Sequence, residues 1–146
     1  AASIYRRLGI PGQEAEMLAS WVEASPESPD AHHALAAFYR RSGDSQSALN
    51  EYLNAAELAP ENPSVRVGLG RTYLDMGLYA DAQAEFLAVL DTRPQDAGLH
   101  LQLADAYRRG GDAAAALDVY QRVTEAFPGT AEAETAARML EAGLKP

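Results

Sequence analysis

A period of 34 residues runs through this chain of 146 residues and limits its fold more than any other feature. Proline, tyrosine and glycine each recur four times in a single register. A period of this length is typical of an array in which each copy is one structural unit and packs on its neighbours. The recurring residues are Pro26, Pro60, Pro94 and Pro128, Tyr5, Tyr39, Tyr73 and Tyr107, and Gly9, Gly43, Gly77 and Gly111.

Each copy carries the start and stop signals of two helices. Ser28 is a good N-cap, and Pro29 suits the first turn of a helix. Gly43 can adopt the left-handed conformation that closes a helix. Asp44 can then cap a second helix, which Pro60 prevents from continuing. These signals predict helices over about residues 30–42 and 44–59, with the other copies repeating them.

The residues between these signals indicate how the helices pack. Small residues on each first helix can lie against small residues on the second, which allows a close approach, while leucine and tyrosine fill the space around the contact. Each helix pair has apolar residues on more than one side, so it must stack on another pair. The small residues are Ala36, Gly70 and Ala104 on the first helices and Ala48, Ala82 and Ala116 on the second.

The pattern Leu-Gly-x-x-Tyr at residues 69–73, followed by Ala82, Phe86 and Pro94, resembles that of the tetratricopeptide repeat family. The resemblance implies an all-α fold, an α-solenoid in which antiparallel helix pairs form a right-handed superhelix. It also divides a single domain, residues 1–146, into a partial repeat at 1–28, repeats at 29–62, 63–96 and 97–130, and a capping helix at 131–146.

Three features depart from the family pattern. His32, Arg66 and His100 replace a large aromatic residue of the first helix, which questions how tightly neighbouring repeats pack. Glu14 replaces an alanine, which predicts a loosely packed first pair. Arg138 replaces a small residue, as expected of a cap on which no second helix packs.

The two ends of the chain lead to further expectations. Ala1 falls partway through a first helix in the register, so we expect the natural protein to continue upstream. Exposed Leu18 and Trp21 would then favour weak end-to-end self-association. Thr130 is expected to cap the final helix. The inner stripe of that helix is predicted to be Ala133, Ala137, Leu140 and Leu144.

Composition excludes several classes of function. The net charge of −9 disfavours nucleic acid and anionic membranes as partners. The absence of cysteine excludes disulfides and thiolate chemistry. No catalytic motif is present, and the Gly68-Leu69-Gly70 run follows no strand, so we expect neither an enzyme nor a bound cofactor. His32 and His100 lie two repeats apart in the register, too far from each other to share a metal ion. Packing or surface roles are expected for His32 and His100 instead.

Arginine pairs follow three of the four repeat tyrosines, at residues 6–7, 40–41 and 108–109. In the family the first helices line a concave groove, and the resemblance implies that these pairs lie at the end of its inner face. A basic stripe can hold carboxylates. The alternative is that arginine here serves solubility and the helix dipole. The expected groove residues are His33, Arg40, Arg41, Val67, Arg71, Leu74, Leu101, Gln102, Asp105, Arg108 and Arg109.

The resemblance implies a non-enzymatic protein-interaction module that binds a partner protein or peptide in this groove. An acidic partner is expected from the arginines. The alternative is a structural scaffold or assembly array in a larger complex, for example in bacterial envelope or polysaccharide-export machinery. The alanine-rich composition, with arginine far in excess of lysine, is typical of a bacterial protein. No apolar run is long enough to span a bilayer, which predicts a soluble chain without direct membrane insertion, in either the cytoplasm or the periplasm.

Overall fold

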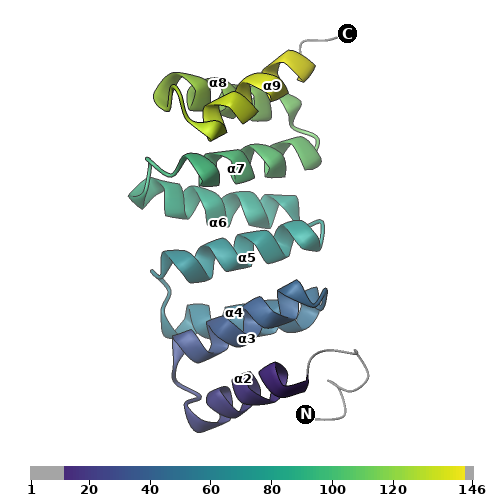
Figure 1. The fold of residues 1–146 in the computed structure, drawn as a ribbon, viewed down its shortest axis with the longest axis vertical. Helices are drawn as coiled ribbons and strands as arrows, with labels where there is room; N and C mark the ends of the chain where they lie inside the picture. The colour runs from purple at the N-terminus through teal and green to yellow at the C-terminus, as the bar shows by residue number, and fades with distance from the viewer. Residues whose placement is uncertain (1–11, 144–146) are drawn as a thin grey trace. The chain divides into compact units, whose positions relative to one another are not determined.

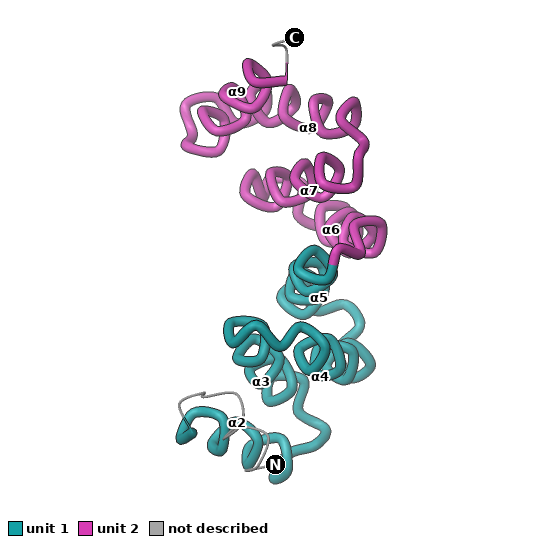
Figure 2. The backbone as a smooth tube through the Cα atoms, turned by 90° about the vertical axis from the view of Figure 1, so that its right-hand side faces the viewer, with its two compact units in different colours: residues 1–76 teal, residues 77–146 magenta. Residues whose placement is uncertain are grey.

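The computed structural model describes residues 12–143, which form eight helices and no strand (Figure 1). The predicted all-α fold is therefore confirmed for this part of the chain. The helices group into two compact units, residues 1–76 and 77–146 (Figure 2). The sequence features at Tyr5, at the arginines 6–7, at Gly9 and at Leu144 lie outside the described residues.

The first unit contains helices α2 (Gly12–Ala24), α3 (Pro29–Arg41), α4 (Ser45–Leu58) and α5 (Pro63–Asp75). Each helix packs on the next one along the chain, and α3 also contacts α5. The most extensive of these contacts joins α3 and α4, as expected for the two helices of one repeat.

The second unit contains α6 (Tyr79–Thr92), α7 (Ala97–Arg109), α8 (Ala113–Ala126) and α9 (Ala131–Gly143). Sequential helices again pack together, and α9 contacts both α7 and α8. The α7–α8 pair corresponds in the 34-residue register to α3–α4 of the first unit.

The predicted caps are present at the helix ends. The Ser28 side chain accepts a hydrogen bond from the backbone N–H of Ala31 at 3.2 Å, and Asp44 accepts one from Ser47 at 3.0 Å. Asn62, Asp96 and Asp112 cap helices in the same way. Gly43, Gly77 and Gly111 all have positive φ, between 75° and 89°, which an L side chain rarely adopts. The prediction that the helix pairs break at these glycines is confirmed.

Helix α6 is the exception among the capped helices. Leu78 occupies its N-cap position, and no side chain accepts a hydrogen bond there. The backbone dihedrals of Leu78, φ −90° and ψ 70°, nevertheless match those of Asp44, φ −91° and ψ 77°. The backbone therefore adopts the capped geometry without a capping side chain.

The core of the first unit consists of two clusters. Ala15 and Leu18 of α2 pack with Leu35 and Phe38 of α3. A second cluster joins α3, α4 and α5 through Ala36, Ala48, Tyr52 and Leu69. Ala36 and Ala48 are fully buried in it, as the expected close approach of small residues requires.

Helix α9 differs in part from the prediction. Thr130 caps it by accepting a hydrogen bond from Ala133 at 3.1 Å, and Arg138 is exposed, as expected. The buried residues, however, are Ala133 and Ala136, whereas Ala137 is exposed. The predicted inner stripe is wrong at this position, because the buried face follows the i, i+3 spacing rather than i, i+4.

The three residues that replace the aromatic residue of the family pattern each make the same kind of hydrogen bond. His32 Nε2 hydrogen-bonds the carbonyl oxygen of Pro26 at 2.8 Å, and His100 Nε2 bonds that of Pro94 at 2.9 Å. Arg66 Nε donates to the carbonyl oxygen of Pro60 at 2.8 Å. Each of these prolines lies six residues earlier and follows the end of the preceding helix. The departure from the family pattern therefore supplies a polar contact between one repeat and the next.

Candidate partner-binding surface

Arg40 and Arg41 end helix α3, where positive charge is favoured by the partial negative charge of the helix C-terminus. Arg40 Nε donates to Asp75 Oδ2 of α5 at 2.8 Å. Arg41 Nη2 donates to Glu14 Oε1 of α2 at 2.7 Å. The end of α3 is thus tied to the helices on both sides of it, and both arginines are paired with carboxylates of the chain itself.

The Tyr52 side chain of α4 packs between α3 and α5, in the second core cluster of the first unit. Its ring is 3% exposed and meets the His33 ring edge-on, with centroids 5.6 Å apart. A Cβ added to Gly68 of α5 would overlap the Tyr52 ring. The ring therefore fits at this place because residue 68 is a glycine. Burial raises the pKa of Tyr52, and the charges of Arg40 and Arg71 oppose that rise. Tyr52 therefore places a buried aromatic ring near Arg40 and Arg71, two of the predicted groove residues.

The remaining predicted residues of the first unit differ in exposure. Arg71 is exposed, and Val67 and His33 are half-buried. Leu74 is only 7% exposed and belongs to the core. Leu74 therefore offers a partner almost no surface, although the register places it at the position of Arg40 in the next repeat.

The predicted arginines of the second unit share one carboxylate. Arg108 Nη2 donates to Asp105 Oδ1 at 2.6 Å, and Arg109 Nη1 lies 3.6 Å from Asp105 Oδ2. The hydrogen bond to Asp105 raises the pKa of Arg108. The Arg109 guanidinium lies 5.4 Å from the centroid of the Tyr79 ring, within the range of a cation–π contact. Both arginines remain exposed, while Leu101 and Gln102 nearby are half-buried.

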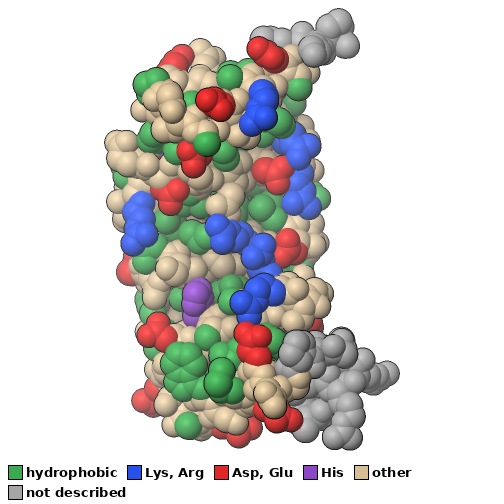
Figure 3. All heavy atoms as spheres, viewed as in Figure 1, with side chains coloured by type: hydrophobic (Ala, Val, Ile, Leu, Met, Phe, Trp, Pro, Cys, Tyr) green, Lys and Arg blue, Asp and Glu red, His purple; other side chains and the backbone are tan. Residues whose placement is uncertain are grey.

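A buried tyrosine also accompanies the arginines of the second unit. Tyr120 of α8 occupies the register position of Tyr52 and is 5% exposed. Burial raises its pKa, and its hydroxyl is hydrogen-bonded to Arg108. An arginine near a buried tyrosine is thus found in both units. On the face drawn in Figure 3, arginine side chains lie among both acidic and hydrophobic side chains.

Sequence reasoning missed the side chains that complete this surface. Glu14 and Asp75 had no assigned contact, although both pair with a predicted arginine. Tyr52 and Tyr120 had no role assigned beside the arginines. Their recurrence 68 residues apart, each 12 residues after an arginine, is a signal from which the arginine–tyrosine arrangement could have been found.

Among residues 12–143, no group of three or more histidine, aspartate or glutamate side chains is arranged to hold a metal ion. None of the helices described combines the length and the apolar character needed to cross a bilayer.

The sequence pattern of the tetratricopeptide repeat family matches residues 31–66 and 67–131, which together run through both units. The chain belongs to the tetratricopeptide repeat family. Proteins of this family are generally protein-interaction modules and are typically not enzymes. A search of curated proteins found no match to this tetratricopeptide repeat protein.

Solved structures with the same fold are numerous. A MamA double mutant has a TM-score of 0.81 and 19% identity, and the alignment covers 97% of this chain and 78% of that one. Another MamA crystal form has a TM-score of 0.73 and 23% identity, with coverages of 97% and 73%. YrrB, described as a tetratricopeptide repeat protein with an unusual peptide-binding site, has a TM-score of 0.76, 20% identity, and coverages of 85% and 64%. At these low sequence identities, the TM-scores show that the chains share a fold.

Proposed function

We propose that this protein is a non-enzymatic interaction module that binds a partner protein or peptide through the first helices of its repeats, which are α3 and α5 in the first unit and α7 in the second. The observation that carries the proposal is the recurrence of an arginine that reaches solvent near a buried tyrosine, with Arg40 partly exposed near Tyr52 and Arg108 exposed near Tyr120. Arginine forms charge-assisted hydrogen bonds with carboxylates, and tyrosine adds apolar contact area. A tetratricopeptide repeat relative, YrrB, is itself described as having a peptide-binding site.

The partner that best fits this surface is an acidic segment. Arg40 is already paired with Asp75, and Arg108 with Asp105. A carboxylate of the partner would therefore replace the carboxylate of the chain in each ion pair. Such an exchange leaves the arginine charge compensated throughout and discriminates against partners that carry no acid. Because the pairs are exposed to solvent, we expect binding to weaken as salt concentration rises.

The proposal can be tested by selecting random displayed peptides on the intact protein. We expect acidic peptides to be enriched and R108A/R109A to weaken their binding at least tenfold. A matched control, R122A/R138A, removes the same charge from exposed arginines of α8 and α9 and is expected to change affinity less than twofold. Failure to enrich any peptide, or equal losses in both double variants, would contradict the proposal.

The second candidate is a structural array within a larger complex. It is favoured by one observation: Arg40, Arg41, Arg108 and Arg109 are each paired with an acidic side chain of the same unit. Those pairs would then serve only to order the helices. In that case R40A/R41A would lower stability and leave peptide affinity unchanged.

A further inference from the structure

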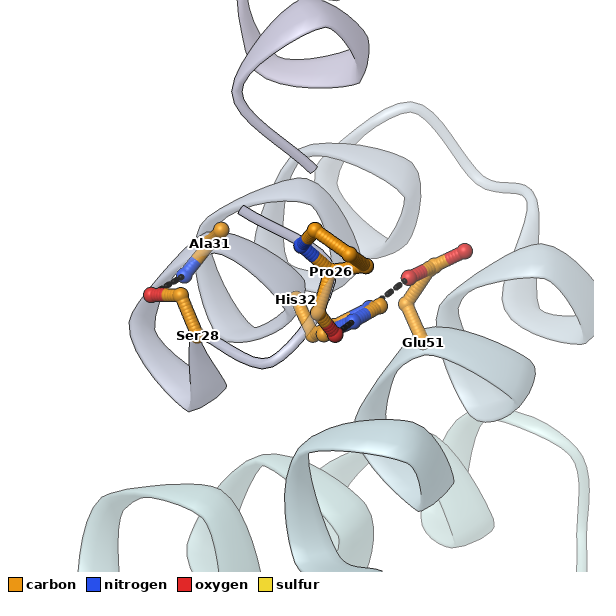
Figure 4. Close-up of polar contacts among 5 residues, drawn as sticks. All are labelled: Pro26, Ser28, Ala31, His32 and Glu51. Carbon is orange, nitrogen blue, oxygen red and sulfur yellow. Dashed lines mark hydrogen bonds and ion pairs between the residues drawn. The ribbon is translucent and has the colours of Figure 1, made fainter. Parts of the chain in front are cut away.

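With Glu51 ionised, only a protonated His32 ring satisfies both of the hydrogen bonds that its side chain makes. It is 7% exposed, with Nδ1 2.6 Å from Glu51 Oε2 of α4 and Nε2 2.8 Å from the carbonyl oxygen of Pro26 (Figure 4). An ionised carboxylate and a carbonyl can only accept hydrogen bonds. Both ring nitrogens must therefore carry a proton, which makes the ring an imidazolium. A neutral ring would leave one nitrogen lone pair facing an acceptor.

We propose that His32 is a pH-sensitive lock, in which the imidazolium fastens α4 and the segment before α3 to helix α3, and deprotonation opens it. The two bonds come from different parts of the unit, because Pro26 precedes α3 and Glu51 lies nineteen residues after His32. Losing the proton removes one of them and the charge attraction to Glu51. The lock rests on this geometry and is independent of the proposed function.

The charges near His32 support this assignment. Burial lowers the pKa of His32, but the hydrogen bonds to Glu51 and Pro26 and the charge of Glu51 outweigh it, so the pKa is raised. Glu23 at the end of α2, Glu27 in the connection and Asp30 on α3 are exposed. On α4, Glu51 is the charged group that acts on the ring, and no charge of α5 does so.

The direction of the pH effect follows from the raised pKa. The lock contributes its full stability below the unfolded histidine value of about 6.5, and this contribution is lost as pH rises through the folded pKa. Each unit by which the folded pKa exceeds the unfolded one changes the opening equilibrium about tenfold. Alkaline pH therefore loosens the first unit around α3, the helix that also carries His33 and Arg40.

The chain contains its own controls for this effect. His100 occupies the same register position in the second unit and bonds Pro94 in the same way, but Val119 stands where the first repeat has Glu51. In the intervening repeat the position is Arg66, which bonds Pro60 and stays charged at any accessible pH. His100 is therefore a histidine without the carboxylate partner, and Arg66 is a hydrogen-bond donor that does not titrate.

Nuclear magnetic resonance titration of the three histidines in the intact wild-type protein is the direct test. We expect the His32 ring to titrate above the unfolded histidine value of about 6.5, and E51Q to move the His32 transition to lower pH. A wild-type His32 transition at or below about 6.5, or one that E51Q does not move, would overturn the proposal.

Hydrogen–deuterium exchange tests the structural consequence. After correction for the intrinsic pH dependence of exchange, protection of residues 26–58 should fall severalfold between pH 6 and pH 8.5, while residues 97–126 should not change. H32R should remove this pH dependence, and H100R should leave it intact. If H32R disturbs the packing, E51Q provides the second readout, because it should shift the loss of protection to lower pH. Loss of protection that is insensitive to both His32 and Glu51 would overturn the proposal.

Discussion

The two units carry the same arginine pair at the end of a corresponding helix but use it differently. Arg40 and Arg41 of α3 reach carboxylates on α5 and α2, whereas Arg108 and Arg109 of α7 share Asp105 of their own helix. The ion pairs of the first unit tie three helices together, whereas those of the second unit lie within one helix. Arginines that are equivalent in the register can therefore link neighbouring helices in one unit and pair with a carboxylate of their own helix in the other.

The histidines give the same lesson. His32 and His100 make the same bond to a proline carbonyl, yet only His32 has a carboxylate on its second nitrogen. The first unit thus has polar contacts between its helices, from Arg40, Arg41 and His32 to carboxylates, that the equivalent residues of the second unit do not make with carboxylates of other helices. The following predictions test how far this difference extends.

The largest effect is expected at Gly68. G68A should lower the free energy of unfolding by about 1–2 kcal/mol, because overpacking against the buried Tyr52 ring exceeds the roughly 1 kcal/mol that alanine gains as a helix former. In the second unit, G98A should stabilise the protein slightly, since its new Cβ would meet only Asp96 Oδ1 at 3.6 Å. Urea unfolding of both variants measures the contrast. In a Y52L background the cost of G68A should largely disappear, and a persistent cost there would show that the ring is not its cause.

A gain in stability is expected at Leu78. L78D should stabilise the protein by about 1 kcal/mol, because the backbone already has the dihedrals of the capped starts at Asp44 and Asp112. Leu78 is 41% exposed, so its removal costs little apolar burial. Thermal unfolding should show a raised Tm, and D112A should show the opposite change of similar size. An unchanged Tm for L78D would mean that the cap is not the limiting feature at the start of α6.

The smallest effects concern the arginine pairs themselves. A double-mutant cycle for Arg40 and Asp75 should give a coupling energy of up to about 1 kcal/mol, because the pair joins two helices and each side chain is about one-third exposed. The cycle for Arg108 and Asp105 should give about 0.3 kcal/mol, typical of an exposed pair within one helix. Raising the salt concentration should reduce both values. Equal couplings in the two cycles would remove the proposed difference between the units.

Much of the fold could be predicted because the signals for it are local. Ser28, Asp44 and Gly43 act on the backbone within a few residues of themselves, so their positions determine where helices begin and end. The period then repeats these local results along the chain. The assignment of Ala137 to the inner face of α9 was wrong because alanines at neighbouring positions give periodicity little to distinguish.

The candidate surface could be predicted only in part. The register located Arg40 and Arg108, but their partners depend on how long side chains reach across packed helices. Glu14 and Asp75 lie 27 and 35 residues away from the arginines they bind, and no local pattern connects them. Whether the predicted groove residues contact a partner stays a prediction, as does end-to-end self-association through Trp21, which is exposed. Leu18 was wrongly expected to be exposed, because it packs into the core between α2 and α3.

The bonds to Pro26, Pro60 and Pro94 have a consequence for how such an array can evolve. Each bond spans six residues, from the proline to a side chain in the next helix, so the connection between repeats cannot gain or lose a residue without breaking it. The donor itself is replaceable, since histidine and arginine both serve. Point substitution is therefore tolerated at this position, whereas a change in the length of the connection is not, and adding or removing a whole copy of 34 residues leaves every such connection intact. Duplication and loss of complete repeats become the favoured route by which the array changes its size.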